Sequence, residues 1–273
     1  MIEAQKAYPD LLVGFIDVEQ AFDREYAEKL GLDTSEDKFI LIQPDSANQA
    51  LDLLLSFITS GLFSLAVLDS IPALVPEQNL AADVGAIQVA SLGRLLSNEI
   101  RRTMIEAKKS NTAALLINQW RAGIGFGQPE KVMSGGAAMK YYPSMTIDLK
   151  RKELIKKGDN VIGILVQANF LKHRFGAPYT KAEYNLYFGE GIRKSDEACE
   201  VAKDKGFIER RGAWYTFPKA DGTTDRTQGM ESVINYYREN PVDFKYLEDL
   251  VINSFKSEKV IEAEDDTDEI ETD

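Results

Sequence analysis

Two apolar runs that end in acidic residues constrain the fold of this chain more than any other feature. The first run covers Leu11 to Ile16 and is followed by Asp17 and Glu19. The second run reads LAVLDS and ends in Asp69 and Ser70. Short apolar runs of this kind are typical of strands that are buried on both faces of a parallel sheet. Because parallel strands end at one edge of a sheet, we expect these polar residues to face a common site.

The alternation of strand-like and helix-like segments predicts an α/β fold. Helical periodicity, as in the segment 47–59, separates the strand-like runs. Those runs are Leu11 to Asp17, Phe39 to Gln43, Ser64 to Ser70 and Thr112 to Gln119. This pattern predicts a mostly parallel sheet flanked by helices. After Gly136, two further strand-like runs enclose a Lys-Gly-Asp-Asn turn at 157–160, which indicates an antiparallel hairpin.

Changes in composition divide the chain into three expected parts. Glycines at 189 and 191 interrupt the pattern, and we place a domain boundary near Ile192. The expected parts are a core domain over 1–192, a small α+β domain over 193–256 and a disordered acidic tail over 257–273. The tail contains nine acidic residues, and the net charge of the whole chain is −12. It either promotes solubility or competes with an anionic ligand for basic surface elsewhere on the protein.

The cysteine and histidine counts exclude several kinds of site. The single cysteine, Cys199, forms no internal disulfide, and with the single histidine, His173, it makes no zinc site. Metal chemistry would therefore use carboxylates and hydroxyls, which favours Mg²⁺. The sequence has neither an apolar run long enough for a membrane helix nor a positively charged, apolar leader. We expect a soluble protein of the cytoplasm with no membrane partner.

The acids at the strand ends suggest half of a nucleotide site. Asp69 with Ser70 has the form of a strand end that positions Mg²⁺ beside nucleotide phosphates, and Glu19 is placed to orient an attacking water. The structural alternatives are a capping role for Asp69 and a solvated loop acid at Glu19. No G-x-x-x-x-G-K-[ST] sequence is present, so the loop that cradles phosphates is missing.

A basic helix face and two long loops suggest a nucleic-acid surface. In the run QVASLGRLLSNEIRRTMIEAKK, Arg94, Ser97 and Arg101 share one helix face, away from the apolar residues. A long loop precedes this run, and the Gly-rich segment RAGIGFGQPEKVMSGGAAMK follows the next strand. Together they predict an electropositive groove for single-stranded nucleic acid. The alternatives are a solvated basic face and ordinary surface loops.

These segments together resemble the bacterial RecA recombinase family. The resemblance extends over essentially the whole chain in FIDVEQAFD, QPDSANQALD, LAVLDSIPALVP, NTAALLINQWR, GQPEKVMSGGAAMKYYPS, GAPYTKAEYNLYFGEGI, RRGAWYTF and the acidic tail. It implies a RecA-like fold with ATP and Mg²⁺ as cofactors. In the family pattern Glu19 is the catalytic glutamate that activates water, and Gln119 senses the γ-phosphate. Asp69 with Ser70 is the indirectly Mg²⁺-linked pair, and Asp23 and Tyr26 bind ATP, with Tyr26 stacked on the adenine.

The resemblance also implies partners. Lys172 and Arg174 match a pair that reaches across a subunit interface to the neighbouring ATP in a helical filament. Single-stranded and double-stranded DNA are the expected ligands of two loops, at 77–89 and 120–139. The residues implied in DNA binding are Val89, Arg94, Ser97, Arg101, Arg121, Ile124, Gly135, Gly136 and Ala137. Val89 and Ile124 match side chains that wedge between bases.

The largest departure from the family is at the N-terminus. The phosphate loop and the N-terminal oligomerisation segment of the family have no counterpart, so the chain resembles a truncated, C-terminal part of a recombinase. A split gene with a separate N-terminal fragment, an intron and a misassigned start all remain open. The leading hypothesis is a homologous recombination and repair protein that hydrolyses ATP only with its missing part. The alternatives are a non-catalytic module that binds single-stranded DNA or modulates a filament, and an inactive remnant.

Overall fold

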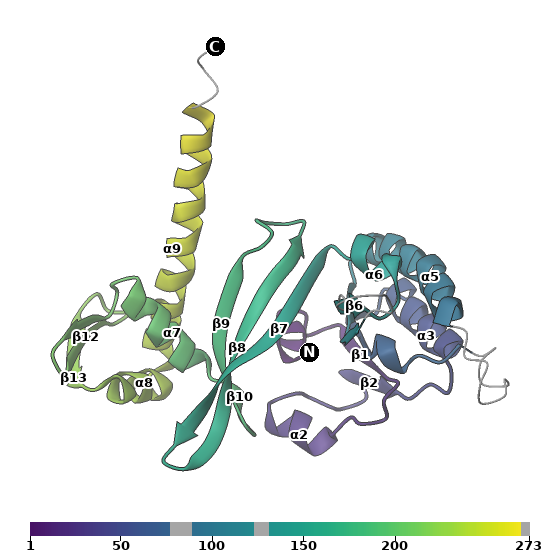
Figure 1. Cartoon of the computed structure of the whole chain (residues 1–273). Helices are drawn as coiled ribbons and strands as arrows, with labels where there is room; N and C mark the ends of the chain where they lie inside the picture. The colour runs from purple at the N-terminus through teal and green to yellow at the C-terminus, as the bar shows by residue number, and fades with distance from the viewer. Residues whose placement is uncertain (77–88, 123–130, 269–273) are drawn as a thin grey trace. The chain divides into compact units, whose positions relative to one another are not determined.

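The computed structural model describes residues 1–76, 89–122 and 131–268, without the side chains of 89–91, 122 and 257–268 (Figure 1). The chain forms two compact units. The first, here called the N-terminal unit, comprises Met1–Asp148 and Asn169–Thr180. The second, the C-terminal unit, comprises Leu149–Ala168 and Lys181–Asp273. The predicted domain boundary near Ile192 stays a prediction.

A parallel sheet forms the centre of the N-terminal unit. Its strands are β1 (Leu12–Asp17), β2 (Phe39–Ile42), β3 (Phe63–Asp69) and β4 (Ala113–Leu116), in the order β2-β1-β3-β4. All three pairings are parallel, as the apolar runs predicted. The register sets Asp17 of β1 opposite Asp69 of β3. The carboxyl ends of these neighbouring strands therefore coincide, and the predicted α/β class is confirmed.

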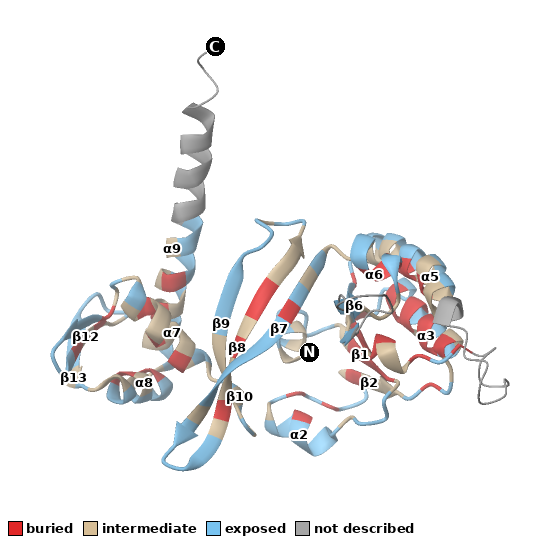
Figure 2. Cartoon of the chain, viewed as in Figure 1, coloured by how far each residue is buried: buried red, intermediate tan, exposed pale blue. Residues whose placement is uncertain are grey.

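Helices cover both faces of this sheet. The helical elements are α1 (Ile2–Ala7), α2 (Arg24–Lys29), α3 (Ala47–Thr59), the 3₁₀ turn η1 (Ile71–Ala73), α5 (Val89–Ser110) and α6 (Ala137–Tyr141). On one face, Leu54 of α3 and Leu96 of α5 pack in one core with Leu68 of β3. On the other face, Val13 and Val67 pack beside residues of α1 and α2. Figure 2 shows this burial in red along β1 and α3.

The helices begin and end where local chemistry requires. The predicted segment 47–59 coincides with α3, because Ser46 precedes it and its side chain accepts a hydrogen bond from the Gln49 N–H. Similarly, Asp23 caps α2 by accepting from the Tyr26 N–H at 2.9 Å. These caps satisfy backbone donors that a helix start would otherwise leave without partners.

The C-terminal unit contains a second core. It has an antiparallel sheet of three strands, β11 (Glu209–Arg211), β12 (Trp214–Pro218) and β13 (Thr224–Gln228). Its helices are α7 (Lys194–Asp204), α8 (Met230–Glu239) and α9 (Pro241–Asp268). Its core includes Phe217, Tyr237 and Cys199, all nearly inaccessible to solvent. The side chains of α9 beyond Lys256 lie outside the described residues, so the disordered acidic tail over 257–273 remains a prediction.

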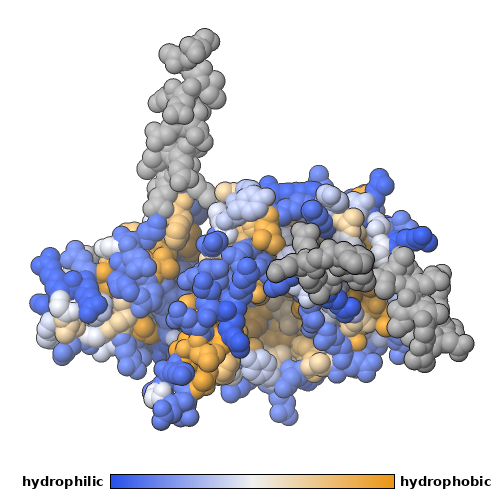
Figure 3. All heavy atoms as spheres, in the orientation of Figure 1, coloured by the Kyte–Doolittle hydropathy of each residue, from blue (hydrophilic) through white to orange (hydrophobic). Residues whose placement is uncertain are grey.

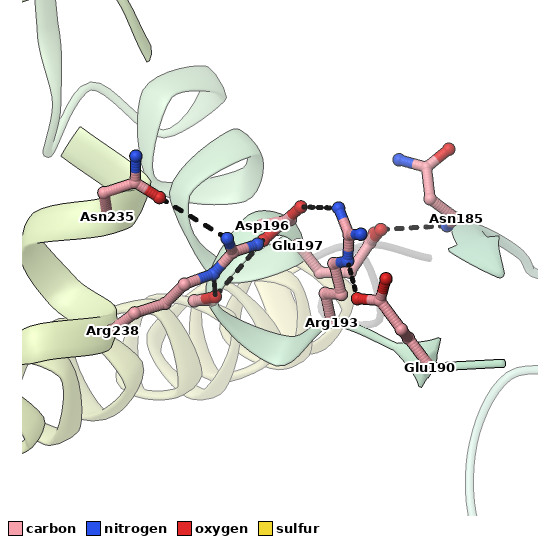
Figure 4. A network of polar contacts seen from close by, with 8 residues as sticks. Asn185, Glu190, Arg193, Asp196, Glu197, Asn235 and Arg238 are labelled. Carbon is pink, nitrogen blue, oxygen red and sulfur yellow. Dashed lines mark hydrogen bonds and ion pairs between the residues drawn. The ribbon is translucent and has the colours of Figure 1, made fainter. Parts of the chain in front are cut away.

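A network of ion pairs also links elements of the C-terminal unit (Figure 4). Arg193 pairs with Glu190 at 2.8 Å and with Asp196 at 3.7 Å. Asp196, which is largely buried, also pairs with Arg238 of α8. A buried carboxylate with two guanidinium partners ties α7 to α8. We assign this network a structural role.

The predicted hairpin is present. It consists of β7 (Met145–Lys157) and β8 (Asn160–His173), and β9 (Lys181–Tyr187) and β10 (Gly191–Ile192) complete a sheet in the order β10-β9-β8-β7. A separate antiparallel ribbon joins β5 (Trp120–Ala122) to β6 (Lys131–Met133). In the described part of the chain no helix is long and apolar enough to cross a bilayer. Figure 3 shows hydrophilic side chains over much of the visible face.

Candidate nucleotide and DNA site

Glu19 and Asp69, which stand fifty positions apart in the chain, meet at one edge of the parallel sheet. The Asp69 carbonyl accepts hydrogen bonds from the N–H groups of Val18 at 2.7 Å and Glu19 at 3.3 Å. The next residue, Ser70, is fully buried, follows a cis peptide bond and donates its hydroxyl hydrogen bond to Oε1 of Glu19. The structure thus brings together the three polar groups that the strand ends predicted.

The electrostatics of this edge favour a bound cation. Burial raises the pKa of Asp69, and the negative charges of Glu19 and Asp17 raise it further. Carboxylate and hydroxyl oxygens are the donors that Mg²⁺ prefers, and a cation here would relieve the repulsion among the acids. Among the described residues, no three histidine, cysteine or acidic side chains form a metal cage. The residues present fit an ion held largely by water and substrate phosphates.

Asp17 has a role that the sequence did not reveal. It is almost completely buried, with 1% of its surface exposed. Its carboxylate accepts from the N–H groups of Ala21 at 3.2 Å and Phe22 at 3.0 Å, and from Nε2 of Gln43 at 3.0 Å. These bonds hold the turn that carries Glu19. The available signal was the position of Asp17 in an apolar strand, where an acid must find donors.

The predicted adenine-binding residues lie just beyond this turn. Tyr26 exposes 43% of its surface, which leaves its ring accessible for stacking. Asp23 is exposed and already accepts a hydrogen bond as the cap of α2. The geometry is compatible with a nucleotide at this position, and the ATP-binding roles of both residues stay predictions.

Gln119 lies at the same edge of the sheet, beyond β4. The Ile117 N–H donates to Leu68 of β3 at 3.0 Å, and the Ile117 carbonyl accepts from Ile71 at 2.9 Å. These bonds hold the end of β4 beside the end of β3. Gln119 itself is exposed, and its N–H donates to Oδ1 of Asn118 at 2.8 Å. The side chain is therefore accessible to solvent, and its role toward a nucleotide stays a prediction.

The base of the second loop is anchored on several sides. Nδ2 of Asn118 donates to the Ser134 carbonyl at 2.9 Å, and Nη2 of Arg121 donates to the Pro72 carbonyl at 3.3 Å. Nε1 of Trp120 donates to Asp148 at 2.7 Å. The β5–β6 ribbon therefore extends from the same edge as Gln119. Ile124, the predicted wedge, lies outside the described residues.

The glycines after β6 bring the loop against α5. Gly135 has a φ of +90°, and a Cβ built there would lie 2.8 Å from Leu96 Cδ1 of α5. Gly136 has a φ of +68°, with nothing within 4 Å of such a Cβ. Gly136 and Ala137 are exposed at the start of α6. Only glycine approaches α5 closely at position 135 without strain.

The predicted basic face on α5 is present. Arg94 and Arg101 are exposed, whereas Leu96 and Ile100 are buried against the core. The hydroxyl of Ser97, between the two arginines, donates to the Gly93 carbonyl at 2.7 Å. Val89 is the first residue of α5, and its side chain lies outside the described part. The Gly135 segment packs against Leu96 of α5, the helix that also carries the exposed arginines, and the DNA-binding roles of these residues stay predictions.

Lys172 and Arg174 converge on one carbonyl. Nζ of Lys172 donates to the Tyr141 carbonyl at 2.7 Å, and Nη2 of Arg174 approaches the same oxygen at 3.5 Å. Burial lowers the pKa of Lys172, and the positive charge of Arg174 lowers it further. The structure therefore places the two predicted interface cations together on β8 and the segment that follows it.

Comparison with known proteins finds relatives of one family. A family model described as the RecA N-terminal domain matches residues 1–193. The chain is 36% identical over 241 residues to Protein RecA of Syntrophus aciditrophicus, covering 88% of this chain and 68% of the relative. The matches to Protein RecA of Streptomyces rimosus and of Clostridioides difficile, at 38% and 37% identity over 231 residues, each cover 84% of this chain.

The relatives are longer than the matched region. The match to the Streptomyces rimosus protein covers 60% of that protein, and the match to the Clostridioides difficile protein covers 64%. Among solved structures, a RadB recombinase aligns with a TM-score of 0.48 and 23% identity, covering 70% of this chain and 82% of the other. The family model and the curated relatives together place the chain: it belongs to the RecA family.

Proposed function

We propose that this chain is part of a RecA-type recombinase that acts in homologous recombination and DNA repair. Its curated relatives are RecA proteins, and the chain spans 60–68% of the length of the three described above. The observation that carries the proposal is the hydrogen bond from Ser70 to Glu19 beside Asp69. It fixes the proposed base, Glu19, to the residue that follows Asp69, the proposed magnesium-facing acid, and phosphoryl transfer to water requires both groups.

In this proposal the chain supplies the water-handling half of an ATP site. Glu19 accepts the proton of the attacking water, and Ser70 holds the Glu19 carboxylate in position. Asp69 faces the water shell of Mg²⁺, which when bound with ATP neutralises phosphate charge. Gln119 contacts the γ-phosphate, and Asp23 and Tyr26 bind the adenosine end of ATP. A polypeptide segment with a phosphate-binding loop completes the site, either as a separate N-terminal fragment or as part of a longer chain.

The same chain binds DNA in this proposal. Arg94, Ser97 and Arg101 contact the backbone of single-stranded DNA, together with Arg121 and the segment of Gly135, Gly136 and Ala137. Val89 and Ile124 wedge between bases. The exposed arginines and the close packing of Gly135 on α5 support one continuous surface.

Copies of the chain associate into a filament, and the filament pairs the bound single-stranded DNA with duplex DNA. Lys172 and Arg174 then leave the Tyr141 carbonyl and contact the ATP of the neighbouring subunit. Both cations contact only backbone carbonyls, those of Lys140 and Tyr141, among the bonds described here, and an anionic partner would be a stronger acceptor. The proposed place of action is the cytoplasm.

Salt-dependent DNA binding tests this function. Anisotropy of a labelled oligothymidine should show weaker binding for the double variant Arg94→Ala and Arg101→Ala, with a salt slope that is shallower by about one to two ions. Lys108→Ala is the matched control, since it removes an exposed cation from the far end of α5. An unchanged slope in the double variant would remove these arginines from the DNA surface.

A second candidate is a non-catalytic module that binds single-stranded DNA or modulates a filament. The exposed arginines of α5 support this candidate, because a cationic face can bind DNA without hydrolysing ATP. ATP hydrolysis distinguishes the two candidates. The recombinase proposal requires DNA-stimulated hydrolysis once a phosphate-loop polypeptide is added, whereas the module shows none under any condition.

A further inference from the structure

A cavity of about 400 Å³ lies between the small sheet and one helix of the C-terminal unit. Its walls come from β12 and β13 on one side and from α8 on the other, and Figure 1 shows α8 beside these strands. All of its residues belong to the C-terminal unit, and none of them is part of the proposed nucleotide or DNA site. The volume is within the range of small-molecule sites, about 300–1,000 Å³.

The strands contribute a carboxylate to the cavity without a balancing cation. Asp225 of β13 pairs with Phe217 of β12, and directly opposite residues of an antiparallel pair share one face of the sheet. Asp225 is therefore on the face of the buried Phe217. The next residue, Arg226, points to the other face, because side chains alternate along a strand. Its guanidinium lies there, 5.0 Å from the centroid of the Trp214 ring.

The helix contributes an aromatic ring and a second carboxylate. Residues 232, 235, 236 and 239 line the cavity from α8, and their spacing puts them on one face of the helix. The ring of Tyr236 packs against that of Phe217, with centroids 4.9 Å apart. Glu239 follows three residues later, about 4.5 Å along the helix axis. The cavity therefore combines an aromatic wall with a carboxylate from each side, Asp225 from the strand and Glu239 from the helix.

The polar groups of the cavity are not used by the rest of the described chain. No hydrogen bond or ion pair within the described residues involves the side chains of Glu239, Ser232 or Thr227, all of which line the cavity. Asp225 accepts only the N–H of its neighbour Arg226, through Oδ1 at 2.7 Å. Two carboxylates without a cationic partner therefore face one cavity, together with two hydroxyl groups.

The ring of Tyr236 differs from other aromatic rings of this unit. A lysine or arginine of the chain itself lies over the rings of Tyr187, Trp214, Tyr215 and Phe255. Among the described residues, no such cation lies over Tyr236, although carboxylates surround it. The hydrogen bond to Asp243 and burial raise the pKa of Tyr236, and the negative charges of Asp243 and Asp225 raise it further. An external cation would complete at Tyr236 what the chain supplies to the other rings.

We propose that this cavity binds a linear aliphatic diamine or polyamine. One ammonium group pairs with Asp225 and another with Glu239, and the methylene chain between them lies against the ring of Tyr236. The hydroxyls of Ser232 and Thr227 accept the remaining ammonium hydrogens. Two carboxylates beside an apolar wall match two charges joined by an apolar chain better than they match a single cation. This inference goes beyond the proposed function, because it uses none of the residues assigned to ATP or DNA.

Calorimetric titration of the full chain with spermidine, in about 0.15 M salt, tests the site. Asp225→Asn and Glu239→Gln should each weaken binding about tenfold, because each removes a charged hydrogen-bond acceptor. Both side chains are exposed, so the fold tolerates these changes. Glu231→Gln is the matched control, since it removes the same charge from the first turn of α8, outside the cavity. Equal losses in all three variants indicate general attraction to an acidic protein and overturn the proposal, as does an absence of binding.

Variants of Tyr236 test the aromatic wall. Tyr236→Phe keeps the ring and should bind spermidine within about twofold of the wild type. Tyr236→Leu removes the ring and should weaken binding about three- to tenfold. Amide chemical shifts outside the cavity verify that each variant is folded. Wild-type affinity in a folded Tyr236→Leu variant contradicts the role of the ring.

A ligand series identifies the source of the cation. Butylamine, which has one ammonium group, should bind about tenfold more weakly than putrescine, which has two on a chain of the same length. Equal affinities contradict the paired recognition by Asp225 and Glu239. A short lysine peptide with blocked ends represents a basic side chain of a protein partner. Weaker binding of this peptide than of spermidine supports the proposal, whereas tighter binding that depends on both carboxylates assigns the cavity to a polypeptide and overturns it.

Discussion

The hydroxyl of Ser70 donates a hydrogen bond to Oε1 of Glu19, and this bond links the ends of two neighbouring parallel strands. Ser70 is fully buried, whereas Glu19 is exposed. The buried Ser70 therefore holds the solvent-facing carboxylate of Glu19 in place. Such an arrangement orients a base without burying it.

The bond between these two residues predicts unequal effects on ATP hydrolysis. In the complex with a phosphate-loop polypeptide, Glu19→Gln should lower hydrolysis by about 100-fold or more, because the base is lost. Ser70→Ala should lower it by about tenfold, since only the orientation of the base is lost. Steady-state phosphate release measures both, and the exposed Glu25→Gln serves as control. Equal activity of Glu19→Gln and the wild type would exclude Glu19 as the base.

Asp17 should contribute to stability through its three hydrogen bonds. Asp17→Asn replaces one acceptor oxygen by an NH₂ group that faces the donors of Ala21, Phe22 or Gln43. We expect the free energy of unfolding to fall by about 1–3 kcal/mol, because a buried group loses its partner. Urea unfolding measures this change, with the exposed Asp10→Asn as control. Equal stability of both variants would show that the turn does not depend on the Asp17 charge.

The adjacent glycines Gly135 and Gly136 should respond differently to the same substitution. Both have positive φ, but only at position 135 would a new Cβ meet Leu96 and Met139, each at 2.8 Å. Gly136→Ala should cost about 1 kcal/mol from backbone strain alone. Gly135→Ala should cost about 2 kcal/mol or more, because the clash in a buried contact adds to that strain. Thermal unfolding compares the two variants, and equal losses would contradict the close packing of Gly135 on α5.

The C-terminal unit should lose stability in alkali. Burial raises the pKa of Cys199 to about 12, and the hydrogen bond to Asp243 raises that of Tyr236 to about 12. The unfolded chain loses these protons at about pH 8.5 and 10, so it binds fewer protons than the folded chain above those values. The stabilisation is therefore complete below about pH 8.5 and lost progressively as pH rises toward the folded pKa values.

Fluorescence of a single tryptophan follows this pH effect. In a Trp120→Phe background, Trp214 reports on the C-terminal unit alone, because the chain has two tryptophans. Denaturant titrations between about pH 8 and 11, in steps of about one pH unit, should show that the free energy of unfolding falls as the pH rises. Cys199→Ala and Tyr236→Phe should each flatten the fall, while Tyr179→Phe, an exposed tyrosine of the other unit, should not. A slope that is insensitive to Cys199 and Tyr236 would contradict the assignment.

Local patterns in the sequence determined the elements of the fold. The apolar runs before Asp17 and Asp69 predicted β1 and β3, and the helical period of 47–59 predicted α3 with its ends. These predictions succeed because burial on two faces, or along one stripe, leaves a period that is readable within a few residues. The same logic placed the acids at one sheet edge, since strands of one direction end together.

The tertiary structure alone decided which of these residues touch. Three of these contacts join residues that are far apart in the chain: Ser70 with Glu19, Gln43 with Asp17, and Lys172 with the Tyr141 carbonyl. Such contacts depend on strand order and register, and a shift of one residue would turn each side chain to the opposite face.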